Sequence, residues 1–142
     1  AQQIIKCFKR GGKLLICGNG GSASMSQHMA AEFMNKFEFD REPLPAISLT
    51  TDTSFITSCS NDSFFELIFA RQVLALGKKN DILIGISTSG NSDNVNYAEW
   101  MADMMGLTVI DFLRKGKTTA KVQEYQLKLM HDIIRIVEKE FI

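Results

Sequence analysis

The chain has 142 residues, enough for one domain with a hydrophobic core of its own. Hydrophobic residues make up 45% and charged residues 23%, a composition typical of a globular protein rather than of a disordered tail. The formal net charge is +0, so no excess positive field is available to hold a nucleic-acid backbone. No run of about 20 apolar residues is present. Nucleic acid and the membrane are therefore excluded as expected partners.

The three cysteines, Cys7, Cys17 and Cys59, are odd in number and lack any C-x-x-C spacing. Their mostly apolar neighbours are typical of buried free thiols, which favours a reducing, cytoplasmic location. No charged-then-apolar leader opens the sequence. Because the first residue is Ala1 rather than Met, we expect residues upstream to be absent and the N-terminal helix to be truncated.

Short β-rich runs alternate with helix-compatible segments along the chain. Strands are predicted at residues 13–17, 46–49, 81–86 and 107–112. Helices are predicted at residues 2–10, 23–37, 61–76, 91–104 and 118–141. Continuous apolar runs such as ILIGI are typical of strands buried on both faces, and the alternation favours right-handed crossovers between parallel strands. The pattern predicts one α/β domain over residues 1–142, a three-layer α/β/α sandwich.

The first predicted strand runs into the glycine-rich sequence GNGGSAS, which opens a helix. Glycines let backbone N–H groups approach an anion at the positive end of a helix, so this turn indicates a phosphate site. Gly18, Gly20 and Ala23 also match a loose dinucleotide fingerprint, which requires an acidic residue at the end of the next strand. Asp52 lies too far along the chain for that role. A tight turn without a ligand remains the alternative.

A second turn, STSGNS at residues 87–92, follows the third predicted strand and again leads into a helix. Its hydroxyls and amides suit one phosphate group. Such a run alone is more often simple helix capping, but its occurrence together with the first turn favours binding. In an open parallel sheet, ligands bind outside the carboxyl ends of the strands. We therefore expect the two turns to converge on one crevice.

His28 and Glu32 are four residues apart on the first of these helices and lie on one face, where they can share a metal ion or a substrate proton. A solvated surface pair is the alternative. The other histidine, His131, follows Gln123 by eight residues on the last helix, about 12 Å along its axis. Gln123 and His131 can therefore bind the same ion only if their side chains are extended or if they belong to different subunits. An ordinary, partly buried histidine is the alternative for His131.

The motifs GNGGSAS, QHMAAEF, ISLTTDTSF, FARQVLALG, ILIGISTSGNS and VQEYQLKLMH, with the pair Asn61-Asp62, resemble the sugar isomerase (SIS) domain family and, within it, the phosphoheptose isomerases. The resemblance covers nearly the whole chain. It implies a flavodoxin-like parallel sheet of five strands and a homotetramer with active sites at subunit interfaces. It also implies interconversion of sedoheptulose 7-phosphate and D-glycero-D-manno-heptose 7-phosphate, the first step of heptose supply for bacterial surface glycans such as lipopolysaccharide.

The resemblance further implies one metal ion per subunit, usually zinc, held by His28, Glu32, Gln123 and His131, a plausible borderline-soft ligand set. Isomerisation through a cis-enediol requires a base and an acid, for which we expect Glu32 and His131 respectively. The metal would act as a Lewis acid or have a mainly structural role. The residues expected to contact the substrate are Asn19, Gly20, Gly21, Ser22, Glu32, Asn61, Asp62, Ser87, Thr88, Ser89, Ser92 and Gln123.

The chain departs from the family pattern at three places. Met25 stands where the family generally has Asp, and Ala120 where it often has an acidic residue. Between Asp111 and Thr118 the family has a longer segment with a glycine-rich turn and a fifth strand, so we expect a segment to be missing between about residues 113 and 118. Two other functions stay open: a non-catalytic SIS-fold regulator that binds the bacterial replication initiator, and an isomerase of another phosphosugar.

Overall fold

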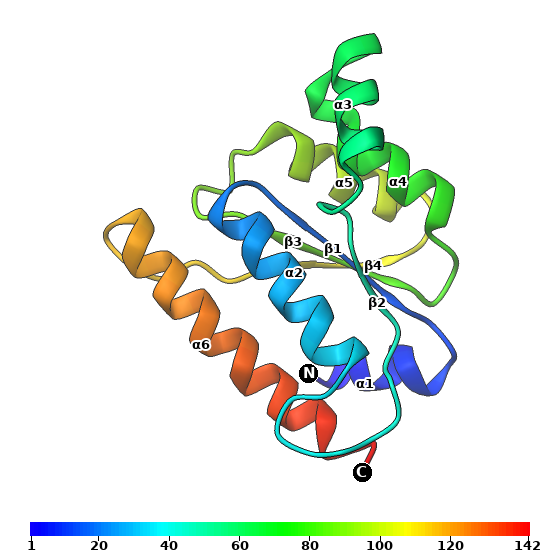
Figure 1. The fold of residues 1–142 in the computed structure, drawn as a ribbon, viewed down its shortest axis with the longest axis vertical. Coiled ribbons are helices and arrows are strands. Elements are labelled where there is room, and N and C mark those ends of the chain that lie inside the picture. Colours follow the sequence, from blue (N-terminus) through cyan, green and yellow to red (C-terminus); the bar gives the residue numbers. More distant parts are fainter.

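The computed structural model describes all residues from 1 to 142 and has the expected three layers, with a parallel sheet between two sets of helices (Figure 1). The sheet has four strands in the order β2-β1-β3-β4. The strands are β1 (Leu14–Gly18), β2 (Ala46–Ser48), β3 (Ile82–Ile86) and β4 (Thr108–Asp111). All four pair in parallel, and each lies within one or two residues of its predicted position.

Helices lie on both faces of the sheet. One layer consists of α1 (Gln2–Lys9), α2 (Gly21–Met34) and α6 (Thr119–Glu138). The other consists of α3 (Thr53–Asp62), α4 (Ile68–Leu76) and α5 (Asp93–Met104), with the 3-10 turn η1 (Phe65–Leu67) before α4. In Figure 1, α2 and α6 lie side by side on the first face, and an aromatic contact between them confirms this proximity.

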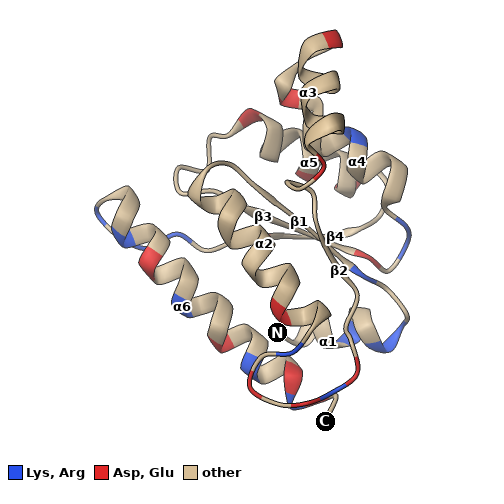
Figure 2. Cartoon of the chain, viewed as in Figure 1, with Lys and Arg blue, Asp and Glu red and all other residues tan.

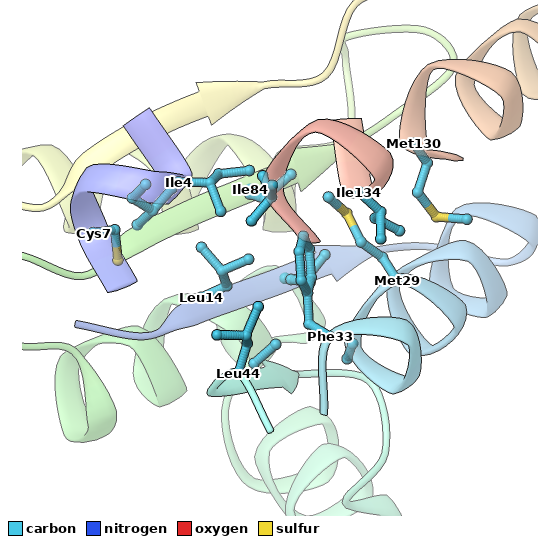
Figure 3. Close-up of a cluster of buried hydrophobic side chains, with 14 of the residues drawn as sticks. Ile4, Cys7, Leu14, Met29, Phe33, Leu44, Ile84, Met130 and Ile134 are labelled. Atoms are coloured by element: carbon cyan, nitrogen blue, oxygen red, sulfur yellow. The ribbon is translucent and has the colours of Figure 1, made fainter. Parts of the chain in front are cut away.

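The alternation of side chains along β1 produces the two cores. Leu14 and Ile16 face the layer of α1, α2 and α6, whereas Leu15 and Cys17 face the layer of α3, α4 and α5. Figure 3 shows part of the first cluster, where Leu14 and Ile84 of the sheet lie among the side chains of three helices, including Ile4, Met29, Phe33 and Ile134. This packing fixes α2 and α6 on the same face of the sheet.

The predicted fifth strand is absent. The seven residues 112–118 join β4 directly to α6, and a crossover to another parallel strand needs a dozen residues or more. The four strands that remain keep the first part of the flavodoxin-like order 2-1-3-4-5.

The single helix predicted over residues 61–76 is wrong, because the chain instead forms α3, η1 and α4. Helix α3 is rich in Ser and Thr, which are weak helix formers. Its hydroxyls nonetheless bond to its own carbonyls, as Thr57 does to Thr53 at 2.6 Å, and Asp52 caps its start by accepting from the Phe55 amide at 2.9 Å. These local bonds, rather than an apolar periodicity, define α3.

The three cysteines are free and buried, as predicted. Burial, with a smaller contribution from Asp81, raises the pKa of the Cys7 thiol to about 11. None of the helices combines the length and apolar character that a membrane crossing requires.

Candidate functional site

The two predicted phosphate turns lie side by side, as expected. Strands β1 and β3 are neighbours, and Gly18 at the end of one pairs with Ile86 at the end of the other. The side-chain amides of Asn19, in the first turn, and Asn94, in the first turn of α5, exchange two hydrogen bonds of 2.8 Å each. Asn94 is buried, so this amide pair links the two turns from below the surface.

Glycines shape the first turn for a close backbone approach. A Cβ atom at Gly18 would lie 2.8 Å from the carbonyl oxygens of Ile86 and Ser22. Gly20 has φ +55°, in the left-handed region that favours glycine, and immediately precedes α2. The turn therefore depends on both glycines, and it brings the backbone directly to the start of the helix.

Neither α2 nor α5 has a side-chain cap at its first turn. The residues before these helices, Gly20 and Ser92, accept no hydrogen bond from the helix through a side chain. The hydroxyls of the second turn bond within the turn instead: Ser87 Oγ accepts from the Gly90 amide at 3.0 Å and Ser89 Oγ from the Asn91 amide at 3.1 Å. The first N–H groups of both helices thus lack side-chain acceptors, which suits an anion.

The members of the two turns differ in exposure. Ser22 and Ser87 are buried, Asn19 and Thr88 are half-buried, and Ser89 is exposed. The remaining predicted members, Gly20 and Gly21 of the first turn and Ser92 of the second, stand at or beside the uncapped helix starts.

Gln123 of α6 lies beside the first turn, because a Cβ atom at Gly21 would stand 2.5 Å from its Nε2 atom. A groove of about 350 Å³ runs from there between α2 and α6. Its lining residues are Gly21, Met25, Ala120, Gln123, Glu124 and Leu127. Met25 and Ala120, two of the residues that depart from the family pattern, thus line the same groove beside the first turn.

A second polar cluster lies further along the same two helices. His28 Nε2 is 3.1 Å from Glu32 Oε1. The His131 ring makes an edge contact with the His28 ring, with centroids 5.3 Å apart, and stacks on Phe37 at 5.1 Å. The Nε2 atom of His131 is buried without a hydrogen-bond partner. The structure therefore brings the predicted base and acid together on one face.

The four predicted metal ligands do not form a ligand set within one chain. No group of three or more His, Cys, Asp and Glu side chains stands where it could hold a metal ion. Gln123 lies against Gly21, seven residues and about 10 Å along the helix axis from His28. The predicted zinc therefore has no ligand set within a single copy of the chain.

Asn61 and Asp62 are not joined to either turn. They lie exposed at the end of α3, where the Asn61 amide donates to the Asp62 carboxylate at 2.9 Å. Figure 1 shows α3 projecting from the end of the molecule, away from the sheet. Their predicted role in substrate binding requires a contact that one chain does not make.

Sequence reasoning missed a buried ion pair beneath the His28 cluster. The side chains of Arg41 and Glu138 are fully buried, with Nε and Oε1 3.2 Å apart. Arg41 also donates to the carbonyls of Glu32 at 2.7 Å and Phe33 at 2.9 Å. Burial acts to raise the pKa of Glu138, but the amides of residues 37–39 and Arg41 outweigh it and hold this pKa below its ordinary value. The pair fastens the end of α2 to α6.

Two further residues of the site were missed, and both are buried amides. Asn94 joins the turns, and Gln126 donates from α6 to the Ser87 carbonyl at 3.0 Å. Gln126 follows Gln123 by three residues and therefore lies on a neighbouring face of α6. Gln126 could have been found from the sequence, because it is a polar residue at a position of α6 where the helical spacing predicts an apolar one.

Comparisons with known proteins agree with this fold. A sequence model described as the SIS domain matches residues 1–113. The chain is 48% identical over 153 aligned positions to a phosphoheptose isomerase of Clostridium acetobutylicum, covering 96% of this chain and 78% of the relative. It is 36% identical to the solved phosphoheptose isomerase of Neisseria gonorrhoeae, with a TM-score of 0.91 and coverage of 97% and 82%.

The chain belongs to the SIS domain family. The relatives above are, more particularly, phosphoheptose isomerases, and so is a relative in Desulfovibrio desulfuricans, 55% identical over 82% of this chain and 55% of its own length. The alignment with the Clostridium protein is longer than the chain itself, so that relative has residues without a counterpart here. The SIS match ends at Leu113, within the short link from β4 to α6.

Proposed function

We propose that the chain is a phosphoheptose isomerase that interconverts sedoheptulose 7-phosphate and D-glycero-D-manno-heptose 7-phosphate. The observation that carries the proposal is the pair of uncapped turns joined by Asn19 and Asn94, together with a cluster of Glu32, His28 and His131. The first turn and this cluster share helix α2. The turns suit a phosphate group, and the cluster offers a carboxylate and an imidazole for proton transfer. The reaction would supply heptose for bacterial surface glycans.

The proposed reaction moves one proton between neighbouring carbons. The Glu32 carboxylate removes a proton from C1 of the ketose while His131 protonates the oxygen on C2, which gives a cis-enediol. Return of a proton to C2 and loss of the proton from the oxygen on C1 then give the aldose. His28, bonded to Glu32 at 3.1 Å and in edge contact with His131, orients both groups.

The spacing of the two parts of the site favours an assembly of several copies. The Glu32 carboxylate lies level with His28, about 10 Å along α2 from Gly21. The six C–C bonds of a heptose, at about 1.5 Å each, span less than about 9 Å from C1 to C7. A substrate would have to be fully extended to bridge that span in one chain, whereas a cluster supplied by a second copy removes this requirement.

Exposed aromatic side chains support the same assembly. Phe64, Phe65, Tyr97 and Trp100 are about half exposed or more, on η1, α5 and the residue before η1. An apolar surface of this kind typically marks a contact with another chain. We propose a homotetramer with active sites between subunits, in which Asn61 and Asp62 of one copy reach the turns of another.

A zinc ion between copies is part of this proposal. His28, Glu32, Gln123 and His131 offer two imidazoles, a carboxylate and an amide, and the buried Nε2 atom of His131 has no partner within the chain. Zinc content and subunit mass are measured on the same sample. Metal-free tetramers with full activity would contradict the proposed zinc site.

The three buried free cysteines support a cytoplasmic location.

The deciding experiment is incubation with sedoheptulose 7-phosphate and measurement of the aldose product. Glu32→Gln and His131→Gln should each lower kcat by a factor of about 100 or more, as expected for loss of a general base or acid. Glu140→Gln is the matched control, because this exposed glutamate pairs only with Lys9 and should retain full activity. An inert wild-type protein would favour a regulator, and conversion of a different phosphosugar would reassign the substrate.

A further inference from the structure

The short link from β4 to α6 carries an arginine that lies on the second turn. A Cβ atom at Gly90 would stand 3.1 Å from Cζ and Nη2 of Arg114 and 3.2 Å from its Nε. Because these three atoms are nearly equidistant from one point, the planar guanidinium lies flat across the open face of Gly90. Gly90 has φ +75° and no side chain, which leaves room for this contact.

Asp111 orients this guanidinium. Its two carboxylate oxygens accept from Nη1 at 2.7 Å and from Nη2 at 2.5 Å, the two-pronged geometry that fixes the plane of an arginine. A guanidinium has five N–H donors, so three remain for another acceptor. Behind the pair, the Glu99 carboxyl lies against Gly85 with Oε1 buried and unpartnered. Asp111 therefore holds the cation at the turn.

The residues predicted to contact the substrate provide no positive charge of their own. They are glycines, amides, hydroxyls and two carboxylates, whereas a phosphate monoester carries a charge of about −1.5 to −2 at pH 7. Arginine is the side chain best suited to pair with phosphate in a fixed orientation. Arg114 follows directly after Leu113, the last residue matched by the SIS family, so the family pattern does not describe it.

We propose that Arg114, oriented by Asp111, is a phosphate-binding residue that provides the positive charge for the group held by residues 87–92. The short link thereby contributes a residue to the site in addition to connecting β4 to α6. The inference rests on the proposed function in so far as the phosphate belongs to a sugar, but inorganic phosphate is a sufficient probe of Arg114 itself.

The test compares Arg114→Gln with wild type in two assays on the intact chain. Calorimetric titration with inorganic phosphate should show a Kd at least tenfold higher, and KM for sedoheptulose 7-phosphate should rise by a similar factor with kcat within twofold. Lys115→Gln removes the same charge from the neighbouring exposed position and should leave both values within twofold. Arg114→Lys, which retains the charge without the fork, should fall between Arg114→Gln and wild type.

Melting temperatures distinguish a role of Arg114 in phosphate binding from a purely structural role in the link between β4 and α6. If Arg114→Gln melts at a lower temperature but keeps the wild-type Kd and KM, Arg114 only braces the link and the proposal is overturned. Unchanged Kd and KM at an unchanged melting temperature overturn it equally. If Arg114→Gln does not fold, Arg114→Lys and Asp111→Asn decide: weaker phosphate binding by the lysine variant supports the proposal, and wild-type binding by both overturns it. A wild type that binds phosphate through Arg114 but does not isomerise the heptose refutes the proposed function alone.

Discussion

Four helices of this chain begin in two contrasting ways. Helices α3 and α6 start with a side-chain cap, in which Asp52 accepts from Phe55 and Thr118 accepts from Lys121. Helices α2 and α5 start without one, at the two turns that meet through Asn19 and Asn94. The capped starts satisfy their own amides, whereas the uncapped ones leave amides available to an anion. Figure 2 shows that no Asp or Glu lies at the start of α2, while Asp93 opens α5.

The contrast continues at the other end of α2. There Arg41 donates to the carbonyls of Glu32 and Phe33 and pairs with the buried Glu138. Helix α2 thus has an open start, whose amides lack side-chain acceptors, and a closed end, whose carbonyls accept hydrogen bonds from Arg41. Substitutions at open and closed ends should accordingly affect different measurements.

The largest effect is expected at the closed end of α2. Glu138→Gln leaves the Arg41 charge buried without a partner, which should cost about 3 kcal/mol of unfolding free energy. Because the pKa of Glu138 is lowered by folding, its contribution is fully present above its ordinary value of 4.5 and is lost as pH falls through the folded value. Denaturant titrations should therefore show the gap between wild type and variant narrowing below pH 4.5. A gap that is constant from pH 7 to pH 3 would contradict this assignment.

Closing an open start should have the next largest effect, with opposite signs on stability and binding. Ser92→Asp places a preferred cap and a negative charge at the start of α5, which should add about 1 kcal/mol of stability. The same carboxylate occupies amides needed by phosphate and repels it, so KM should rise about 100-fold, or about 2.7 kcal/mol. Thr118→Asp on the already capped α6 is the control and should change neither. A Ser92→Asp protein with wild-type KM would show that the start of α5 binds no phosphate.

Removing a cap should affect stability alone. Asp52→Ala and Thr118→Ala should each cost about 1 kcal/mol, because one helix amide loses its side-chain acceptor. Chemical denaturation measures the loss, and steady-state kinetics should give an unchanged KM. A large increase in KM for either variant would contradict the claim that only the uncapped helix starts bind the substrate.

The smallest effect is expected for Gly21→Ala. The new methyl group meets only the flexible end of Gln123, so the unfolding free energy should change by less than about 0.5 kcal/mol. Displacement of that amide should raise KM a few-fold. Gly18→Ala is the informative contrast, since its methyl group would meet two backbone carbonyls and should destabilise the fold measurably.

The apolar runs predicted the sheet well, because strands buried on both faces leave an unbroken hydrophobic signal. Both glycine-bearing turns were also predictable from their residues. Helix α3 was not, since its bonds are hydroxyl to carbonyl and leave no periodic pattern. The pair of Arg41 and Glu138 was equally hidden, because two charged residues 97 positions apart look like surface residues until the fold brings them together.

The site was predictable in its parts but not in their distances. Local spacing placed His28 beside Glu32, and the structure confirms that contact. No local rule could indicate that Gln123 would lie at Gly21 while His131 lies at His28, because that follows from how α6 crosses the sheet. The absence of a fifth strand had a plain sequence cause, the seven residues between β4 and α6, although the family resemblance implied five strands.

The link between Asn19 and Asn94 also bears on how the protein ages. Asn19 precedes Gly20, and an asparagine followed by glycine is the sequence most open to spontaneous loss of its side-chain amide. Both polar atoms of the Asn19 amide are engaged by Asn94, which restrains the ring closure that this reaction needs. Mass spectrometry of stored Asn94→Ala protein should reveal faster conversion of Asn19 than in wild type. Each converted molecule would carry a carboxylate within this turn, so the amide pair should also lengthen the time for which the proposed phosphate site stays intact.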